Sequence, residues 1–146
     1  MYTIRYNMSK QIISQIESKT AFFHLLEHNP GLIILKFGAT WCGPCKKIEP
    51  IVHGFFATSP DEVVCGDIDI DDSFEVYAFL KNKKMVNGIP VMLCYKKGNE
   101  TFIPDDSITS ADPVALDAFF KRCGANLALV KKMYPGKEKT KEVNLV

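Results

Sequence analysis

An apolar run followed by two closely spaced cysteines is the feature that most constrains the fold of this 146-residue chain. Residues 32–37 read Leu-Ile-Ile-Leu-Lys-Phe, and the hexapeptide Trp-Cys-Gly-Pro-Cys-Lys follows at 41–46. The run has the length and the β-branched content of a buried strand. Pro44 suits the first turn of a helix, because the N–H that it lacks would have no partner there. The sequence therefore predicts a strand, a short loop and a helix, with the cysteine pair where the helix begins.

Cysteines at this spacing and in this position are suited to reversible disulfide chemistry. Cys42 falls at or beside the helix N-terminus, where unpaired backbone N–H groups and the helix dipole favour an anion. We therefore expect the pKa of the Cys42 thiol below the free-cysteine value of about 8.5, so that more of it is reactive thiolate at neutral pH. Cys45 is then the resolving thiol, which stays protonated until it is needed. Gly43 carries no side chain and lets another chain come close.

Two other interpretations of Cys42 and Cys45 are a structural disulfide and half of a zinc site. A zinc site needs a second pair of ligands at similar spacing, and the sequence contains none. His24, His28 and His53 are isolated and are expected to be partly exposed residues of helices. The strand–helix context favours the redox interpretation, and no metal site is predicted.

Apolar periodicity and turn residues predict the element order βαβαβαββα, which is an α/β fold with a central mixed sheet and helices on both faces. The alternating aspartates of residues 67–71 fit a strand, since the glycine and the terminal glutamate of a calcium loop are missing. The expected strands are 12–16, 32–37, 63–70, 91–95 and 101–103, and the expected helices are 19–28, 43–57, one opening at Ser73, and one from Pro113 to a C-cap at Gly124.

The residues at 41–46 resemble the active-site sequence of the thioredoxin family, as distinct from glutaredoxins and protein disulfide isomerases. Pro50 resembles the proline that bends the helix after that active site. The stretch Asp-Ile-Asp-Ile-Asp at 67–71 resembles the third strand of the family, and Gly88-Ile89-Pro90 resembles the loop whose proline is cis and faces the disulfide. The resemblance covers residues 10–123 and implies a thioredoxin fold.

The resemblance also implies a function, namely a thiol–disulfide oxidoreductase that reduces protein disulfides through Cys42 and Cys45. Such a protein needs no metal or organic cofactor, acts on disulfide-containing proteins and receives electrons from a thioredoxin reductase. Trp41 would shield the disulfide and offer substrates an apolar face, while the backbone of Ile89 beside Pro90 would pair with an extended substrate. The alternative is a thioredoxin-fold binding or assembly subunit in which redox chemistry is secondary.

Lys36 is the main departure from the family pattern. Most thioredoxins have a buried aspartate at this position, proposed to accept the proton of the resolving cysteine, and a lysine cannot be that carboxylate. One interpretation is that its stem packs under the helix while its amine reaches water. The other is electrostatic: an ammonium stabilises nearby thiolates, whereas a desolvated neutral amine acts as a base. The sequence leaves both open.

The bulk composition narrows the range of partners and compartments. A formal net charge of +1 gives no reason to expect nucleic acid or an acidic membrane as a partner. No apolar run has membrane-spanning length, and the first residues lack the apolar core of a signal peptide. Cys65, Cys94 and Cys123 lie in apolar or periodic segments and are expected to be buried free thiols, which suits a reducing compartment. We therefore expect a cytoplasmic location.

Two parts of the chain are distinguished by composition. Residues 1–124 are expected to form one thioredoxin-like domain, and residues 125–146 a C-terminal extension. The periodicity of 125–133 predicts that this segment extends the last helix or docks on the domain. From Tyr134 onward the chain carries Lys and Glu and too few apolar residues to offset the entropy of ordering, which predicts a mobile charged tail.

Overall fold

A six-stranded sheet with the strand order β1-β2-β4-β3-β5-β6 forms the centre of the computed structural model, which describes residues 4–6 and 10–135. The strands are β1 (Ile4–Tyr6), β2 (Ile12–Ile16), β3 (Leu32–Gly38), β4 (Val63–Asp69), β5 (Val91–Lys96) and β6 (Asp106–Thr109). The helices are α1 (Lys19–Glu27), α2 (Gly43–Lys47), α3 (Glu49–Thr58), α4 (Phe74–Asn82) and α5 (Pro113–Met133).

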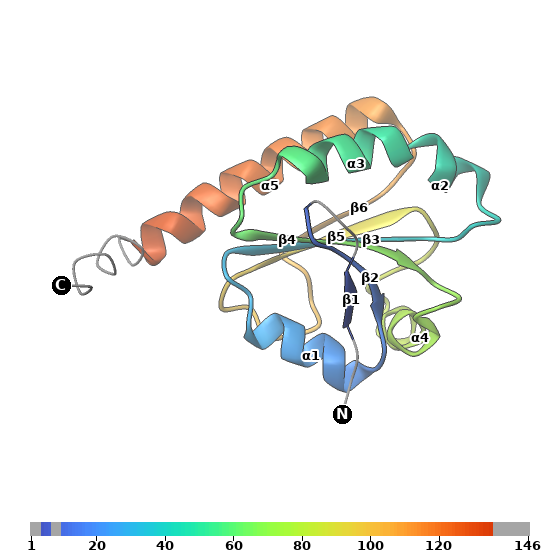
Figure 1. Cartoon of the computed structure of the whole chain (residues 1–146), viewed down its shortest axis with the longest axis horizontal. Helices are drawn as coiled ribbons and strands as arrows, with labels where there is room; N and C mark the ends of the chain where they lie inside the picture. Colours follow the sequence, from blue (N-terminus) through green and yellow to red (C-terminus); the bar gives the residue numbers. More distant parts are fainter. Residues whose placement is uncertain (1–3, 7–9, 136–146) are drawn as a thin grey trace.

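The sheet is mixed and covered on both faces, which confirms the predicted architecture. Strands β2, β4 and β3 are parallel, whereas β5, β6 and the edge strand β1 are antiparallel to their neighbours. Figure 1 shows α1 and α4 on one face and α2, α3 and α5 on the other. Strand β1 was not predicted from the sequence; the other elements follow the predicted order, with the active-site helix divided in two.

Strand β3 lies at the centre of the sheet, and all seven of its residues are buried. Ile33, Leu35 and Phe37 belong to the core that packs against α1 and α4. Leu32 and Ile34 belong to the core on the other face, with residues of α3 and α5. Because side chains alternate along a strand, Lys36 points to the same face as Leu32 and Ile34, beneath the active-site helices.

Local sequence signals correctly predicted several helix boundaries. The side chain of Ser18 caps α1 by accepting a hydrogen bond from Ala21 N at 3.1 Å, and Asp112 caps α5 in the same way. The predicted bend after the cysteines is a break at Ile48, between α2 and α3. Pro50 accounts for this break, because it has no N–H to donate to the carbonyl of Lys46 and its ring would clash there.

The predicted strand at residues 101–103 is wrong, because the last strand, β6, lies at Asp106–Thr109. Residues 99–105 instead form a loop held by side-chain hydrogen bonds. The amide of Asn99 donates to Ile103 O at 2.8 Å and to Asp105 Oδ2 at 3.0 Å, and Asp105 Oδ2 also accepts from Lys96 N. These bonds compete with strand pairing, so the β-propensity of the segment did not decide its conformation.

The predicted C-cap at Gly124 is also wrong, since α5 continues without a break to Met133. Leu127 and Val130 are buried, so the added turns gain apolar contacts that outweigh the weak helix propensity of one glycine. At the helix end, Lys97 lies over the ring of Tyr134 at 4.3 Å from its centroid. The predicted boundary after residue 124 therefore falls inside α5. Residues 136–146 of the predicted mobile tail lie outside the described residues.

None of the helices within residues 4–6 and 10–135 combines the length and the apolar character that a membrane crossing requires.

Two leucines of α5 test whether its last turns are part of the core. Leu127 is 8% exposed and packs in the α3/α5 core, whereas Leu129 is 49% exposed. We expect Leu127→Ala to lower the free energy of unfolding by about 2–5 kcal/mol, because it leaves a cavity. The matched variant Leu129→Ala should change it by less than about 0.5 kcal/mol. Urea denaturation followed by circular dichroism measures both, and equal effects of the two variants would contradict this packing.

Candidate active site

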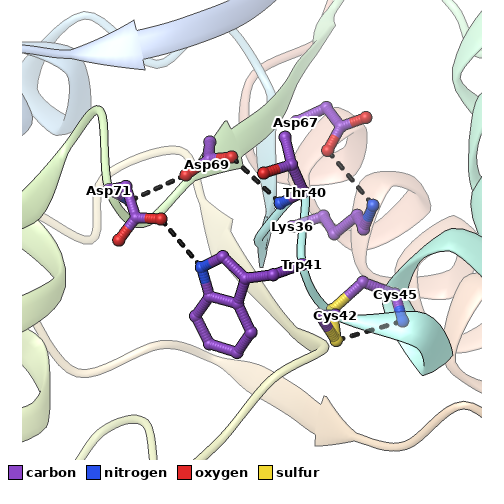
Figure 2. The surroundings of a disulfide bond; sticks show 8 residues. All are labelled: Lys36, Thr40, Trp41, Cys42, Cys45, Asp67, Asp69 and Asp71. Carbon is purple, nitrogen blue, oxygen red and sulfur yellow. Dashed lines mark hydrogen bonds and ion pairs between the residues drawn. A yellow bond between two sulfur atoms is a disulfide. The ribbon is translucent and has the colours of Figure 1, made fainter.

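The two motif cysteines form a disulfide, Cys42–Cys45, with their Cα atoms 5.3 Å apart at the N-terminus of α2 (Figure 2). Cys42 is the N-cap residue, and its Sγ accepts a hydrogen bond from Cys45 N at 3.2 Å. Gly43 and Pro44 fill the first turn, and both are exposed. Cys42 retains 7% exposure and Cys45 only 1%. Both cysteines are thus buried, and Cys42 is the more accessible of the two.

The indole of Trp41 is exposed beside the disulfide, but it is held in place. Its Nε1 donates a hydrogen bond to Asp71 Oδ2 at 2.8 Å. The apolar ring therefore lies on the surface next to Cys42 in a defined orientation, where a bound protein chain would contact it.

The loop before β5 closes the other side of the site. The Ile89–Pro90 peptide bond is cis, as expected, and Pro90 is buried. Ile89 is partly buried and packs, together with Ile70, against a cluster made of Ala39, Cys42 and Cys45. The structure thus brings Ile89, one of the predicted substrate-contact residues, to the cysteine pair, with Pro90 next to it in the chain.

Three alternating aspartates at and just after the end of β4 bind groups around the active site, a role that the sequence did not indicate. Asp69 Oδ2 accepts from Thr40 N at 3.2 Å, and its Oδ1 accepts from Asp71 N at 2.7 Å. Asp71 orients Trp41, and Asp67 forms an ion pair beneath the cysteines. The expected strand is confirmed for residues 63–69, and its acidic end organises the loop that carries the disulfide.

Lys36 is buried, and its amine does not reach water. Its Nζ lies 3.3 Å from Asp67 Oδ1, and its side chain is only 3% exposed. Asp67 is the register partner of Lys36 on β4, while Met92 faces Lys36 from β5 on the other side. The interpretation in which the amine is solvated is therefore wrong, and the ion pair explains how a charged residue occupies the central strand.

His53 is a site residue that the sequence analysis missed. Its Nε2 lies 2.6 Å from Asp67 Oδ2, so Asp67 is shared between His53 of α3 and Lys36 of β3. No local pattern signals this contact, because the two side chains meet only when α3 packs on the sheet. The expectation that His53 is isolated is wrong.

The other two histidines are not isolated either. The rings of His24 and His28 lie 4.1 Å apart between centroids at the end of α1, and His28 Nδ1 contacts His24 O at 2.9 Å. With Glu27 they bring possible metal ligands within 4.8 Å of one another. This group lies on the face of the sheet opposite α2, so it is separate from the disulfide (Figure 1).

Gly38, the last residue of β3, leaves space for the site. A Cβ at this position would lie 3.2 Å from Cys45 Sγ and 3.5 Å from Lys36 Cε. The Cys45 sulfur and the Lys36 stem therefore border the same small space, which any side chain at residue 38 would fill.

The remaining three cysteines are buried free thiols, as predicted. Burial raises the pKa of the Cys65 thiol. A hydrogen bond with Cys94, together with burial, raises the pKa of the Cys123 thiol. All three side chains are closed to solvent, so among the cysteines the nucleophilic chemistry belongs to the pair at α2.

The site can therefore open and close one disulfide at a helix N-terminus, with one sulfur more accessible than the other. The only groups with redox chemistry that it brings together within the described residues are Cys42 and Cys45. A chain with this fold and this pair is a thiol–disulfide oxidoreductase.

Comparison with known proteins gives the family. The family model named Thioredoxin matches residues 13–122. Thioredoxin of Equus caballus is 35% identical over 111 residues, which span 75% of this chain and 97% of that protein. Human thioredoxin is 37% identical over 90 residues, which span 61% of this chain and 81% of the human protein. The chain belongs to the thioredoxin family.

Solved structures confirm the fold. A thioredoxin of Plasmodium falciparum superposes with a TM-score of 0.60 at 28% identity, covering 75% of this chain and 97% of that one. Mitochondrial thioredoxin 3 of Saccharomyces cerevisiae in its oxidized form gives a TM-score of 0.59 at 28% identity, covering 75% and 93%. The predicted thioredoxin fold is confirmed.

The space next to Gly38 generates a prediction for the site. We expect Gly38→Ala to displace Cys45, to lower the free energy of unfolding by about 1–3 kcal/mol and to slow insulin reduction roughly tenfold or more. Gly54→Ala in α3 is the matched control, because its Cβ would meet nothing within 4 Å. This control should raise the free energy of unfolding by about 0.5–1 kcal/mol without loss of activity. Wild-type activity in Gly38→Ala would show that the space is not needed.

Proposed function

We propose that Cys42 is the attacking nucleophile and Cys45 the resolving thiol of a protein-disulfide reductase. The observation that carries this assignment is the asymmetry of the pair: Cys42 caps α2 and is the more exposed, while Cys45 lies inside the first turn. The Cys42 thiolate attacks one sulfur of a substrate disulfide and forms a mixed disulfide, and the other substrate sulfur leaves as a thiolate that takes a proton from solvent.

The second step returns the site to its disulfide form. The Cys45 thiol loses its proton, and its thiolate attacks Cys42 Sγ. The Cys42–substrate bond breaks, and the electron pair leaves with the second substrate sulfur, which is then protonated. The substrate gains two electrons and two protons, and the chain ends as the oxidised form with the Cys42–Cys45 disulfide.

Trp41, Ile89 and Pro90 are proposed as the substrate-binding surface. Trp41 is exposed beside Cys42, and Ile89 packs against the pair from the opposite loop. An extended substrate segment lying between them would place its disulfide over Cys42 and pair its backbone with that of Ile89.

Electrons are proposed to come from a thioredoxin reductase, with the chain acting in electron transport and redox homeostasis of the cytoplasm. The reaction needs no metal or organic cofactor, because the two thiols hold both electrons. Family membership and the three buried free thiols support this proposal.

Insulin reduction tests the activity. With dithiothreitol as electron source, the wild-type chain should accelerate the turbidity that follows cleavage of the insulin interchain disulfides, because Cys42 provides the nucleophile. Cys42→Ser should reduce the acceleration to the level of dithiothreitol alone. If the wild-type chain gave no acceleration, the chain would be a binding or assembly subunit. Replacing dithiothreitol by NADPH and a thioredoxin reductase then tests the electron donor.

Trapping tests the roles of the two sulfurs. We expect Cys45→Ser to accumulate mixed disulfides with substrate proteins through Cys42, because no second thiol releases them. Cys42→Ser should trap few, since Cys45 is almost fully buried. Non-reducing electrophoresis with mass spectrometry of the linked peptides measures both. Equal trapping by the two variants would contradict the assignment, and more trapping by Cys42→Ser would reverse it.

A further inference from the structure

We propose that Lys36, Asp67 and His53 form a proton relay from the Cys45 thiol to solvent. The proposal rests on the assignment of Cys45 as the resolving thiol. It gives the chain a proton acceptor in a site where the family's aspartate is replaced by Lys36, and it gives His53 a role that no sequence motif indicates.

The three side chains form a continuous line from the core to the surface. Lys36 Nζ lies 3.3 Å from Asp67 Oδ1, and Asp67 Oδ2 lies 2.6 Å from His53 Nε2. The exposed fraction of the side chains rises along this line from 3% to 21% to 50%. The inner end is closed to water, and the outer end exchanges protons with it.

The inner end of this line adjoins Cys45. Figure 2 shows Lys36 between Asp67 and the cysteine pair. The Cβ that Gly38 lacks would touch both Cys45 Sγ and Lys36 Cε, at 3.2 Å and 3.5 Å. The stem of Lys36 and the sulfur of Cys45 therefore border the same space, which the absence of a side chain at Gly38 leaves open.

Stability does not account for this arrangement. Burying a lysine and a carboxylate costs desolvation energy that their attraction roughly repays, so apolar residues of similar volume would serve the fold as well. The residue that faces Lys36 from β5, Met92, is apolar. A charged pair at this place, in contact with the solvent-facing imidazole of His53, is the arrangement that a proton relay requires.

The proton balance of the proposed step is simple. Lys36 passes one ammonium proton to the Asp67 carboxylate and receives the proton of the Cys45 thiol. When the Asp67 carboxyl turns, it passes that proton to Nε2 of His53 in the tautomer whose hydrogen is on Nδ1. The Nδ1 proton then leaves to water, and exchange with water restores the first tautomer. Lys36 and Asp67 return to their ammonium and carboxylate forms. The net transfer is one proton from Cys45 to solvent, which leaves the Cys45 thiolate beside the Lys36 ammonium, ready to attack Cys42 Sγ.

Other charged groups near the relay do not join it. Asp69 and Asp71, at the end of β4, bind Thr40 N and Trp41 Nε1. The side chains of Lys46, Lys47 and Glu49, on α2 and the start of α3, are exposed, and within residues 10–135 none of them forms an ion pair with the relay. Within residues 10–135, the ion pairs of Asp67 are those with Lys36 and His53.

Stopped-flow reduction of 5,5′-dithiobis(2-nitrobenzoate) separates the two steps. With reduced protein in excess, the first thionitrobenzoate is released by Cys42 at a rate that depends on protein concentration. The second is released by Cys45 at a rate that does not. His53→Gln keeps a hydrogen-bond donor for Asp67 but cannot carry a proton.

We expect His53→Gln to slow the second phase about tenfold at pH 7 and to leave the first phase within about twofold. The pH profile of the second phase should differ between the wild type and His53→Gln, because only the imidazole can exchange a proton with Asp67. Lys36→Met and Asp67→Asn should also slow the second phase selectively.

The controls keep the proposal testable even where a variant is unstable. His28→Gln, on the opposite face of the sheet, should match the wild type in both phases, and Cys45→Ser should lack the second phase. If Asp67→Asn does not fold, because it leaves Lys36 buried without a carboxylate, His53→Gln decides alone. A second phase in His53→Gln with wild-type rate and pH profile, or equal slowing of both phases, overturns the relay. Absence of both phases in the wild type would instead refute the proposed function.

Discussion

The burial of β3 is the constraint on which the rest of the structure depends. All seven of its residues lie inside the sheet, paired with β4 on one side and β5 on the other. A strand in this position must be apolar on both faces or must pair any charge that it carries. The same strand delivers Cys42 to the N-terminus of α2, so the chemistry of the site and the packing of the core share one segment.

The pairing of Lys36 with Asp67 follows from that constraint. A lysine amine enclosed by apolar neighbours needs a carboxylate within reach, and the parallel register of β3 and β4 places Asp67 directly opposite. Asp67 is then bridged to the surface by His53. The one charged residue of β3 is therefore the buried end of a row of polar side chains that reaches the surface at His53.

The acidic end of β4 has a second consequence for the active-site loop. Asp69 and Asp71 accept hydrogen bonds from the backbone of Thr40 and the indole of Trp41, so residues outside the loop help to fix the segment before Cys42. Preorganisation of this kind reduces the cost of aligning a substrate disulfide with the sulfur that attacks it. The C-terminal turns of α5 stabilise the opposite end of the domain, through Leu127 in the core and the ion pair of Lys131 with Glu62.

The sequence by itself determined the features that depend on neighbouring residues. The strand before the cysteines, the helix that begins at them, the caps at Ser18 and Asp112 and the break near Pro50 all follow from local backbone chemistry. The family resemblance added the thioredoxin fold and the cis bond before Pro90.

Only the tertiary structure decided the features that depend on segments far apart in the chain. The register of β3 and β4 paired Lys36 with Asp67, and the packing of α3 on the sheet brought His53 to the same carboxylate. Side-chain hydrogen bonds from Asn99 keep the segment before β6 out of the sheet, so the last strand lies later than predicted. Burial of Leu127 stabilises the turns of α5 that follow Gly124. Local propensities differ by less than about 1 kcal/mol per residue, whereas a buried side chain or an unpaired buried charge changes the free energy by more. The long-range contacts therefore prevailed wherever the two disagreed.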